Sequence, residues 1–159
     1  MNIYRGKSSS YVRIATISAV ILSLLILFTI ILLNKSLGIT VRVILPLLIV
    51  GAIIYLYSIS LNKIIIEKDS IVLKKNIGKI KIPNTDILDV CIMSYSNLTM
   101  TYGSKGVFGF IGNTMDDSVS LVKDRNQMFR ITTKDKKYLL SSENSEELVG
   151  KMKVLYELQ

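Results

Sequence analysis

The sequence contains no histidine and only one cysteine, Cys91. Histidine is the side chain most often used as a general base and as a metal ligand, so its absence removes the commonest form of both sites. A single cysteine excludes a disulfide within the chain and is compatible with a reducing compartment. No second cysteine or lysine stands near Cys91, which favours a small core residue over a nucleophile. These absences favour a protein without catalytic activity, metal or cofactor.

Acidic residues are absent from the first 61 positions, which carry five lysines and arginines. The remaining 98 positions carry 15 basic and 12 acidic residues, so much of the net charge of +8 surrounds the most apolar part of the chain. Anionic lipids attract cations placed there. A nucleic-acid site would need a basic stripe in the polar part, where the two signs are instead mixed. The charge balance therefore indicates a membrane surface and argues against nucleic acid as partner.

Two long apolar runs contain no charged residue. A hydrocarbon core about 30 Å thick is crossed by about 20 helical residues, and both runs reach that length. They predict transmembrane helices over 14–33 and 43–61, joined by a short external loop over 34–42. The first run is about twice as long as the apolar region of a signal peptide and no small-residue cleavage site follows it. A membrane hairpin is therefore favoured over a cleaved signal sequence.

Basic residues near the helix ends set the expected orientation. Seven lysines and arginines flank the two ends that lead to the chain termini, whereas the loop carries only Lys35 and Arg42. Positive charge favours the cytoplasmic side, so the basic segment 1–13 and everything after the second helix are expected in the cytoplasm. The protein is accordingly expected as a multi-pass protein of the cell (inner or plasma) membrane. Neither run contains an ionisable residue, which favours an anchor over a channel or carrier.

From residue 62 onwards the pattern changes to short β-branched runs separated by turn residues. The last segment, Asn144–Leu158, has apolar residues at helical spacing and glutamates in its first turn, which predicts an amphipathic helix. We therefore expect an α+β, mostly β domain over 62–159, with about seven antiparallel strands in a barrel capped by that helix. The segments expected as strands are the two halves of Lys63–Lys75, then Lys79–Ile82, Ile87–Met93, Val119–Lys123, Gln127–Thr133 and Lys137–Ser141.

Four glycines, at positions 103, 106, 109 and 112, lie between the expected strands Ile87–Met93 and Val119–Lys123. Glycine-rich loops can hold phosphate through backbone N–H groups, but the Walker spacing and the G-x-G-x-x-G pattern are both absent. The interleaved Phe108 and Phe110 favour a loop or bent strand that packs on an apolar surface. A further hypothesis places its tip in the bilayer surface.

Three stretches resemble the bacterial pleckstrin-homology (PH) domains of small membrane-anchored proteins. They are the glycine-rich 103–112, the strand pair 129–142 and the acidic helix start 143–147, while 80–87 is similar to the segment that leads into the next strand of those domains. Such proteins commonly carry two helices before the domain. Serines stand at 142 and 145, where the family often has prolines. The resemblance implies a PH fold beside the membrane and no established activity.

Two non-catalytic functions stay open, because a fold alone does not supply one. One is a membrane-tethered binding or scaffolding module for a protein partner or a second copy of the chain. The other is a reader of anionic lipid head groups. The turn Lys68–Ser70 contains an acid and lacks the cluster of cations that phosphoinositide recognition requires, and the lysines also fit a solvated strand face. The candidate contact residues are Lys74, Lys75, Lys79, Lys81, Lys105, Phe108 and Phe110.

Overall fold

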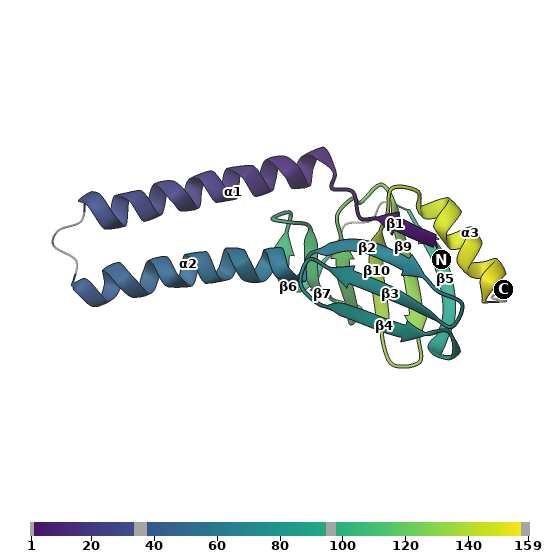
Figure 1. Ribbon diagram of the computed structural model, residues 1–159. Coiled ribbons are helices and arrows are strands. Elements are labelled where there is room, and N and C mark those ends of the chain that lie inside the picture. The colour runs from purple at the N-terminus through teal and green to yellow at the C-terminus, as the bar shows by residue number, and fades with distance from the viewer. Residues whose placement is uncertain (1, 34–37, 95–97, 157–159) are drawn as a thin grey trace.

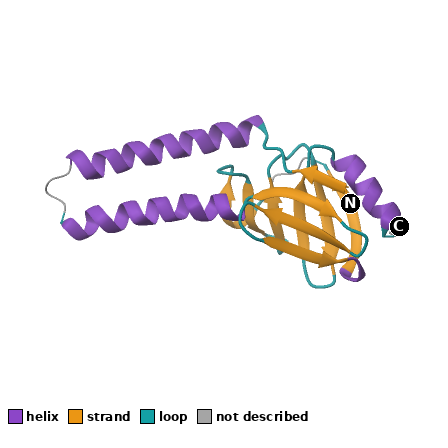
Figure 2. Cartoon of the chain, viewed as in Figure 1, coloured by secondary structure: helices purple, strands orange, loops and turns teal. Residues whose placement is uncertain are grey.

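The computed structural model describes residues 2–33, 38–94 and 98–156. Two long helices project side by side from a body of β-strands, and a third helix lies at the end of that body away from them (Figures 1 and 2). The expected helix pair followed by a mostly β domain is therefore confirmed at this level.

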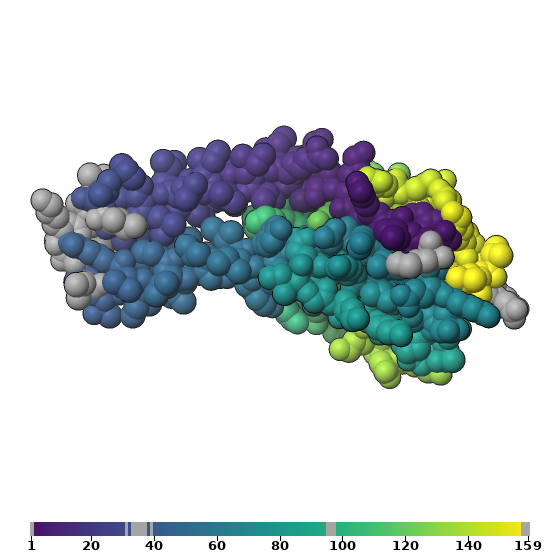
Figure 3. Space-filling model, viewed as in Figure 1, coloured from purple at the N-terminus to yellow at the C-terminus, as the bar shows by residue number. Residues whose placement is uncertain are grey.

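The two long helices are α1 (Ser10–Phe28), which continues as a π-helical turn over Thr29–Leu33, and α2 (Ile39–Ile59). Both are strongly apolar, and almost none of their residues is buried. The space-filling view shows them outside the β domain (Figure 3). A helix of this composition inside a soluble protein would be buried. Each is long and apolar enough to cross a membrane.

The helix ends differ from those predicted. α1 begins four residues before the expected start, because the Ser9 side chain accepts a hydrogen bond from the Val12 amide and caps the helix. Of the predicted loop over 34–42, residues 34–37 lie outside the described part of the chain, and α2 already begins at Ile39. Basic side chains therefore lie in the end turns of both helices, at Arg13 and Arg42.

The strands form two sheets. The first is antiparallel and contains β1 (Asn2–Arg5), β2 (Leu61–Ile66), β3 (Ser70–Lys75) and β4 (Lys79–Pro83), in that order. A short 3₁₀ turn, Asn84–Asp86, leads into the second sheet. In spatial order this sheet contains β5 (Ile87–Met93), β9 (Met128–Thr133), β10 (Lys137–Ser141), β8 (Ser118–Val122), β7 (Phe110–Thr114) and β6 (Met100–Lys105).

The prediction of about seven antiparallel strands is wrong in number and in one pairing. The structure contains ten strands in the described residues, and β8 runs parallel to β10. The parallel pair arises because β10 pairs with β9 on one side and is inserted between β9 and β8. The three strands missed are β1, β6 and β7. The described strands form two separate sheets and not one closed barrel.

The main core lies between the two sheets and under the third helix, α3 (Ser145–Leu155). Phe129 of the second sheet and Ile64 of the first are fully buried, as is Met152 of α3. The Tyr4 hydroxyl of β1 donates to Glu147 Oε1 of α3 over 3.1 Å. The first strand of the chain is thus tied to the last helix.

β1 and β2 are separated in sequence by the whole helix pair and are nevertheless neighbours. Asn2 stands opposite Ile66 and Arg5 opposite Lys63, and the Gly6 amide donates to the Asn62 carbonyl over 2.9 Å. The chain therefore leaves the first sheet through α1 and returns to the adjacent position through α2. Both helices are attached to the β domain at the same end.

Candidate membrane-facing site

The turn between β3 and β4 covers the last turn of α2. The Ile77 amide donates to the Ser58 carbonyl and the Asn76 side chain donates to the Tyr57 carbonyl, each over 2.9 Å. The last carbonyls of a helix lack partners within the helix, and this turn supplies them. The Ile77 side chain is 63% exposed, so an apolar residue stands free beside the end of α2.

The glycine-rich stretch is a β-hairpin whose tip is held by both helices. The Phe108 amide donates to Thr16 Oγ1 of α1 over 2.8 Å, and the Phe108 carbonyl accepts from Ser60 Oγ, next to α2, over 3.0 Å. The Phe108 ring meets the Tyr57 ring edge to face, with centroids 5.7 Å apart. The tip therefore joins the bases of α1 and α2, and its backbone amide faces a threonine and not an anion.

The two phenylalanines singled out from the sequence lie in different surroundings. Phe108 is half-buried at the helix bases, whereas Phe110 is only 5% exposed. The Phe110 ring stacks on Tyr11, with centroids 6.1 Å apart, and the Arg125 guanidinium lies 4.7 Å from its centre. Phe110 is part of the interior and leaves little surface for a partner.

Four basic residues stand in one row across the first sheet, one from each strand. Arg5 lies opposite Lys63, Lys63 opposite Lys74, and Lys74 opposite Lys79. Directly opposed residues of an antiparallel sheet point to the same face, and the adjacent row, which includes Ile64, points into the core. The basic row therefore lies on the outer face, at the end of the sheet nearest α2.

These cations repel one another, since like charges directly opposite each other destabilise a sheet. None of the four forms an ion pair with any residue of the described ranges 2–33, 38–94 and 98–156. Arg5, Lys74 and Lys79 are exposed and Lys63 is half-buried. An anionic surface placed against this face would remove the repulsion.

The remaining predicted lysines lie around this row or away from it. Lys81 is exposed in the next outward row, opposite Val72, and Lys75 begins the β3–β4 turn. Lys105 belongs to the second sheet, opposite Phe110. The structure thus brings Lys74, Lys79 and Lys81 to one face and adds Arg5 and Lys63, which were not chosen from the sequence. Lys75 pairs with the buried Leu61 and lies in a row of the opposite face. Arg5 and Lys63 belong to the basic row only because of the register of strand pairing, and no local sequence pattern predicts their position in it.

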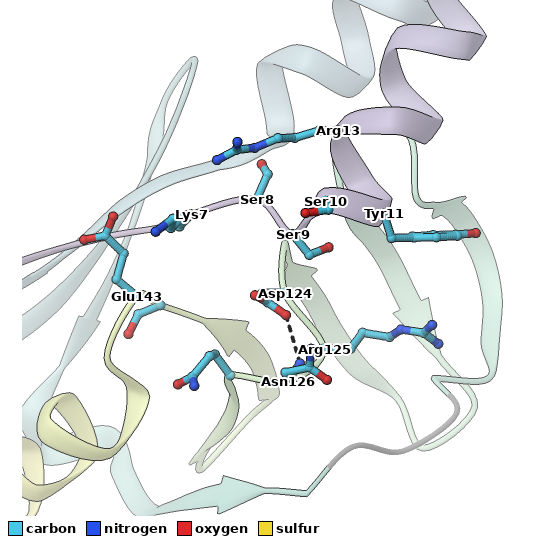
Figure 4. Close-up of a pocket in the computed structure, with 12 residues that line it drawn as sticks. Lys7, Ser8, Ser9, Ser10, Tyr11, Arg13, Asp124, Arg125, Asn126 and Glu143 are labelled. Atoms are coloured by element: carbon cyan, nitrogen blue, oxygen red, sulfur yellow. Dashed lines mark hydrogen bonds between the residues drawn. The ribbon is translucent and has the colours of Figure 1, made fainter.

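A hollow of about 520 Å³ lies beside the first turn of α1 (Figure 4). The Lys7 and Arg13 side chains line it, but so do the carboxylates of Asp124 and Glu143. Asp124 Oδ1 accepts from the Asn126 amide over 3.0 Å, which holds the β8–β9 turn in place. The charges in this hollow are mixed, so it has no marked preference for an anion.

Comparison with protein-family models, with curated proteins and with solved structures finds no match for this chain. The resemblance to PH domains therefore stays a hypothesis, and the function is argued from the junction between the helices and the β domain.

Proposed function

We propose that this chain is a membrane-tethered, non-catalytic binding module. The helix pair crosses the bilayer as a hairpin, and the β domain, which we interpret as PH-like, lies against the cytoplasmic surface. The pairing of β1 with β2 carries the proposal, because it attaches both ends of the helix pair to one sheet. A domain held in this way stays beside the bilayer in a fixed orientation.

The level of the bilayer follows from the uncharged parts of the helices. α2 contains 21 residues, or about 31 Å of helix, and Arg42 in its first turn is its only charged residue. The uncharged part that follows, residues 43–59, measures about 25 Å, at the lower end of the length that crosses a hydrocarbon core. Charge-free sequence begins at Ile14 on α1 and ends at Asn62 beyond α2. Thr16 and Ser58, which hold the hairpin tip and the β3–β4 turn, both lie just inside these limits. The two loops are therefore expected at the bilayer surface.

A second function, the reading of anionic head groups, is favoured by the basic row Arg5–Lys63–Lys74–Lys79. The row lies immediately outside the proposed bilayer boundary, where each cation contributes about 1 kcal/mol of attraction to an anionic leaflet. The free Ile77 side chain adds an apolar contact at the same level. A protein partner, or a second copy bound through the helices, is a further hypothesis. No contact among the described residues supports it.

The orientation is tested by cysteine labelling of the full chain in intact cells, in a Cys91→Ser background. Gly38 and Lys136 are both exposed, the first at the start of α2 and the second in the β9–β10 turn. A membrane-impermeant maleimide should label the Gly38→Cys variant in intact cells, and the Lys136→Cys variant only after permeabilisation. Labelling of the Lys136→Cys variant in intact cells would contradict a cytoplasmic β domain.

A further inference from the structure

A smaller cavity of about 280 Å³ lies between the two helices and the β domain. One wall is the first two turns of α1, another is the end of α2, and the floor is the hairpin tip and the end of β8. The residues that line it are Ser8, Val12, Arg13, Thr16, Ile17, Tyr57, Ser60, Asn76, Phe108 and Lys123. None of these residues is acidic, which distinguishes this cavity from the larger hollow beside it.

Three of the neutral polar side chains of the cavity already have partners. The Thr16 and Ser60 hydroxyls bond the backbone of Phe108, and the Asn76 amide donates to the Tyr57 carbonyl. These bonds fix the walls of the cavity. The two charged side chains in its lining, Arg13 and Lys123, are both cations.

Lys123 is half-buried at the end of β8, and neither it nor Arg13 forms an ion pair with any described residue. Burial lowers the pKa of the Lys123 ammonium, because removing its charge from water costs free energy. A charge in such a place is normally compensated by an opposite charge. Two uncompensated cations over apolar walls are therefore suited to an amphiphilic anion.

We propose that this cavity binds the phosphate of an anionic phospholipid between Arg13 and Lys123. The acyl chains would continue along the apolar surface of Ile17 and Tyr57 into the bilayer. The inference rests on the proposed function, since a lipid reaches the cavity only when the helix pair lies in a membrane. Inorganic phosphate shares the charged group but not the apolar contacts, so a free anion should bind far more weakly.

The test uses the delipidated full chain in a neutral detergent and measures bound ligand by native mass spectrometry. The probes are a short-chain phosphatidylglycerol, a phosphatidylcholine of the same chain length, and inorganic phosphate. We expect the phosphatidylglycerol to bind at least tenfold more tightly than either of the others. Phosphatidylcholine carries the same phosphate, but its choline cation would be repelled by Arg13 and Lys123, and inorganic phosphate lacks the apolar contacts. Equal binding of the two lipids would overturn the site, and equal binding of inorganic phosphate would reassign it to free anions.

Two variants test the two cations separately. Lys123→Met keeps the length of the apolar stem and removes the charge, and Arg13→Gln alters an exposed position on α1. Each should weaken phosphatidylglycerol binding about tenfold, whereas Lys136→Met in the exposed β9–β10 turn should not change it. Lys123→Met should also fold without loss of thermal stability, because it removes an unpaired charge. Unchanged binding in both cavity variants would refute the proposal.

Whether the helix pair anchors the protein in the membrane is tested independently, by alkaline carbonate extraction of membranes that contain the full chain. Release of the protein into the supernatant would refute the membrane-tethered function and the lipid site together. Retention in the membrane without a preference for phosphatidylglycerol would refute the lipid site alone.

Discussion

Replacement of Gly112 by alanine should lower the free energy of unfolding by about 3 kcal/mol or more. Gly112 stands opposite Gly103 in the β6–β7 hairpin, with φ at +146°, a conformation that L side chains rarely adopt. A Cβ at Gly112 would lie 2.1 Å from the Tyr102 carbonyl oxygen and 2.8 Å from the Gly103 Cα. Because these are backbone atoms, no side-chain rotation can relieve the overlap.

The Gly112→Ala effect is measured by denaturant unfolding of the full chain in detergent, with Gly51→Ala as control. Gly51 lies within α2 and has nothing within 4 Å of a Cβ, so alanine there should cost nothing. Damage to the hairpin should also release its tip, which would expose the Phe108 amide to faster hydrogen exchange. Wild-type stability of Gly112→Ala would show that the two strands do not approach each other as described.

Tyr4→Ala should lower the free energy of unfolding by about 3 kcal/mol, although Tyr4 lies at the fourth position of the chain. Tyr4 is only 9% exposed, packs in the main core and bonds Glu147 of α3. Its neighbour Ile3 points to the opposite face of β1 and is 52% exposed. Ile3→Ala should therefore change the stability by about 0.5 kcal/mol or less.

The same unfolding experiment compares the two β1 variants. A strand with one buried face should show a large loss of stability in Tyr4→Ala and little change of stability in Ile3→Ala. Equal, small effects would mean that the N-terminal segment is not an integral part of the first sheet. The pairing of β1 with β2, on which the proposed membrane hairpin rests, would then be contradicted.

Local patterns predicted the parts of the fold that short segments determine. The strict alternation of Lys79–Ile82 and the β-branched run Ile87–Met93 both became strands, β4 and β5. The acidic start and apolar stripe near the C-terminus became α3. Ile82 of β4, Val90 of β5 and Met152 of α3 are buried, as these patterns imply, so no distant contact was needed to recognise the three elements.

The missed strands carry no strand pattern in their own sequence. β1 has four residues and pairs with a strand that follows the helix pair, so the sequence near Asn2–Arg5 does not predict it. β6 and β7 are held by the paired glycines Gly103 and Gly112, which locally resemble a loop. The basic row arises only from register, and the cavity cation Lys123 looks in sequence like an ordinary lysine at a strand end.

The central claim is that the helix pair crosses a bilayer whose surface lies at the β3–β4 turn. The chain contains no tryptophan, so a single introduced tryptophan reports its own depth by quenching with brominated lipids in proteoliposomes. Suitable positions are Leu24, exposed in mid-α1, Ile77 in the turn, and Val154, 84% exposed on α3 at the far end of the β domain.

The account predicts that Leu24→Trp is quenched by lipids brominated deep in the acyl chain and Ile77→Trp by lipids brominated near the head group. Val154→Trp should not be quenched by either. An unquenched Leu24→Trp would contradict the membrane hairpin. A quenched Leu24→Trp with an unquenched Ile77→Trp would contradict only the placement of the β domain at the bilayer surface.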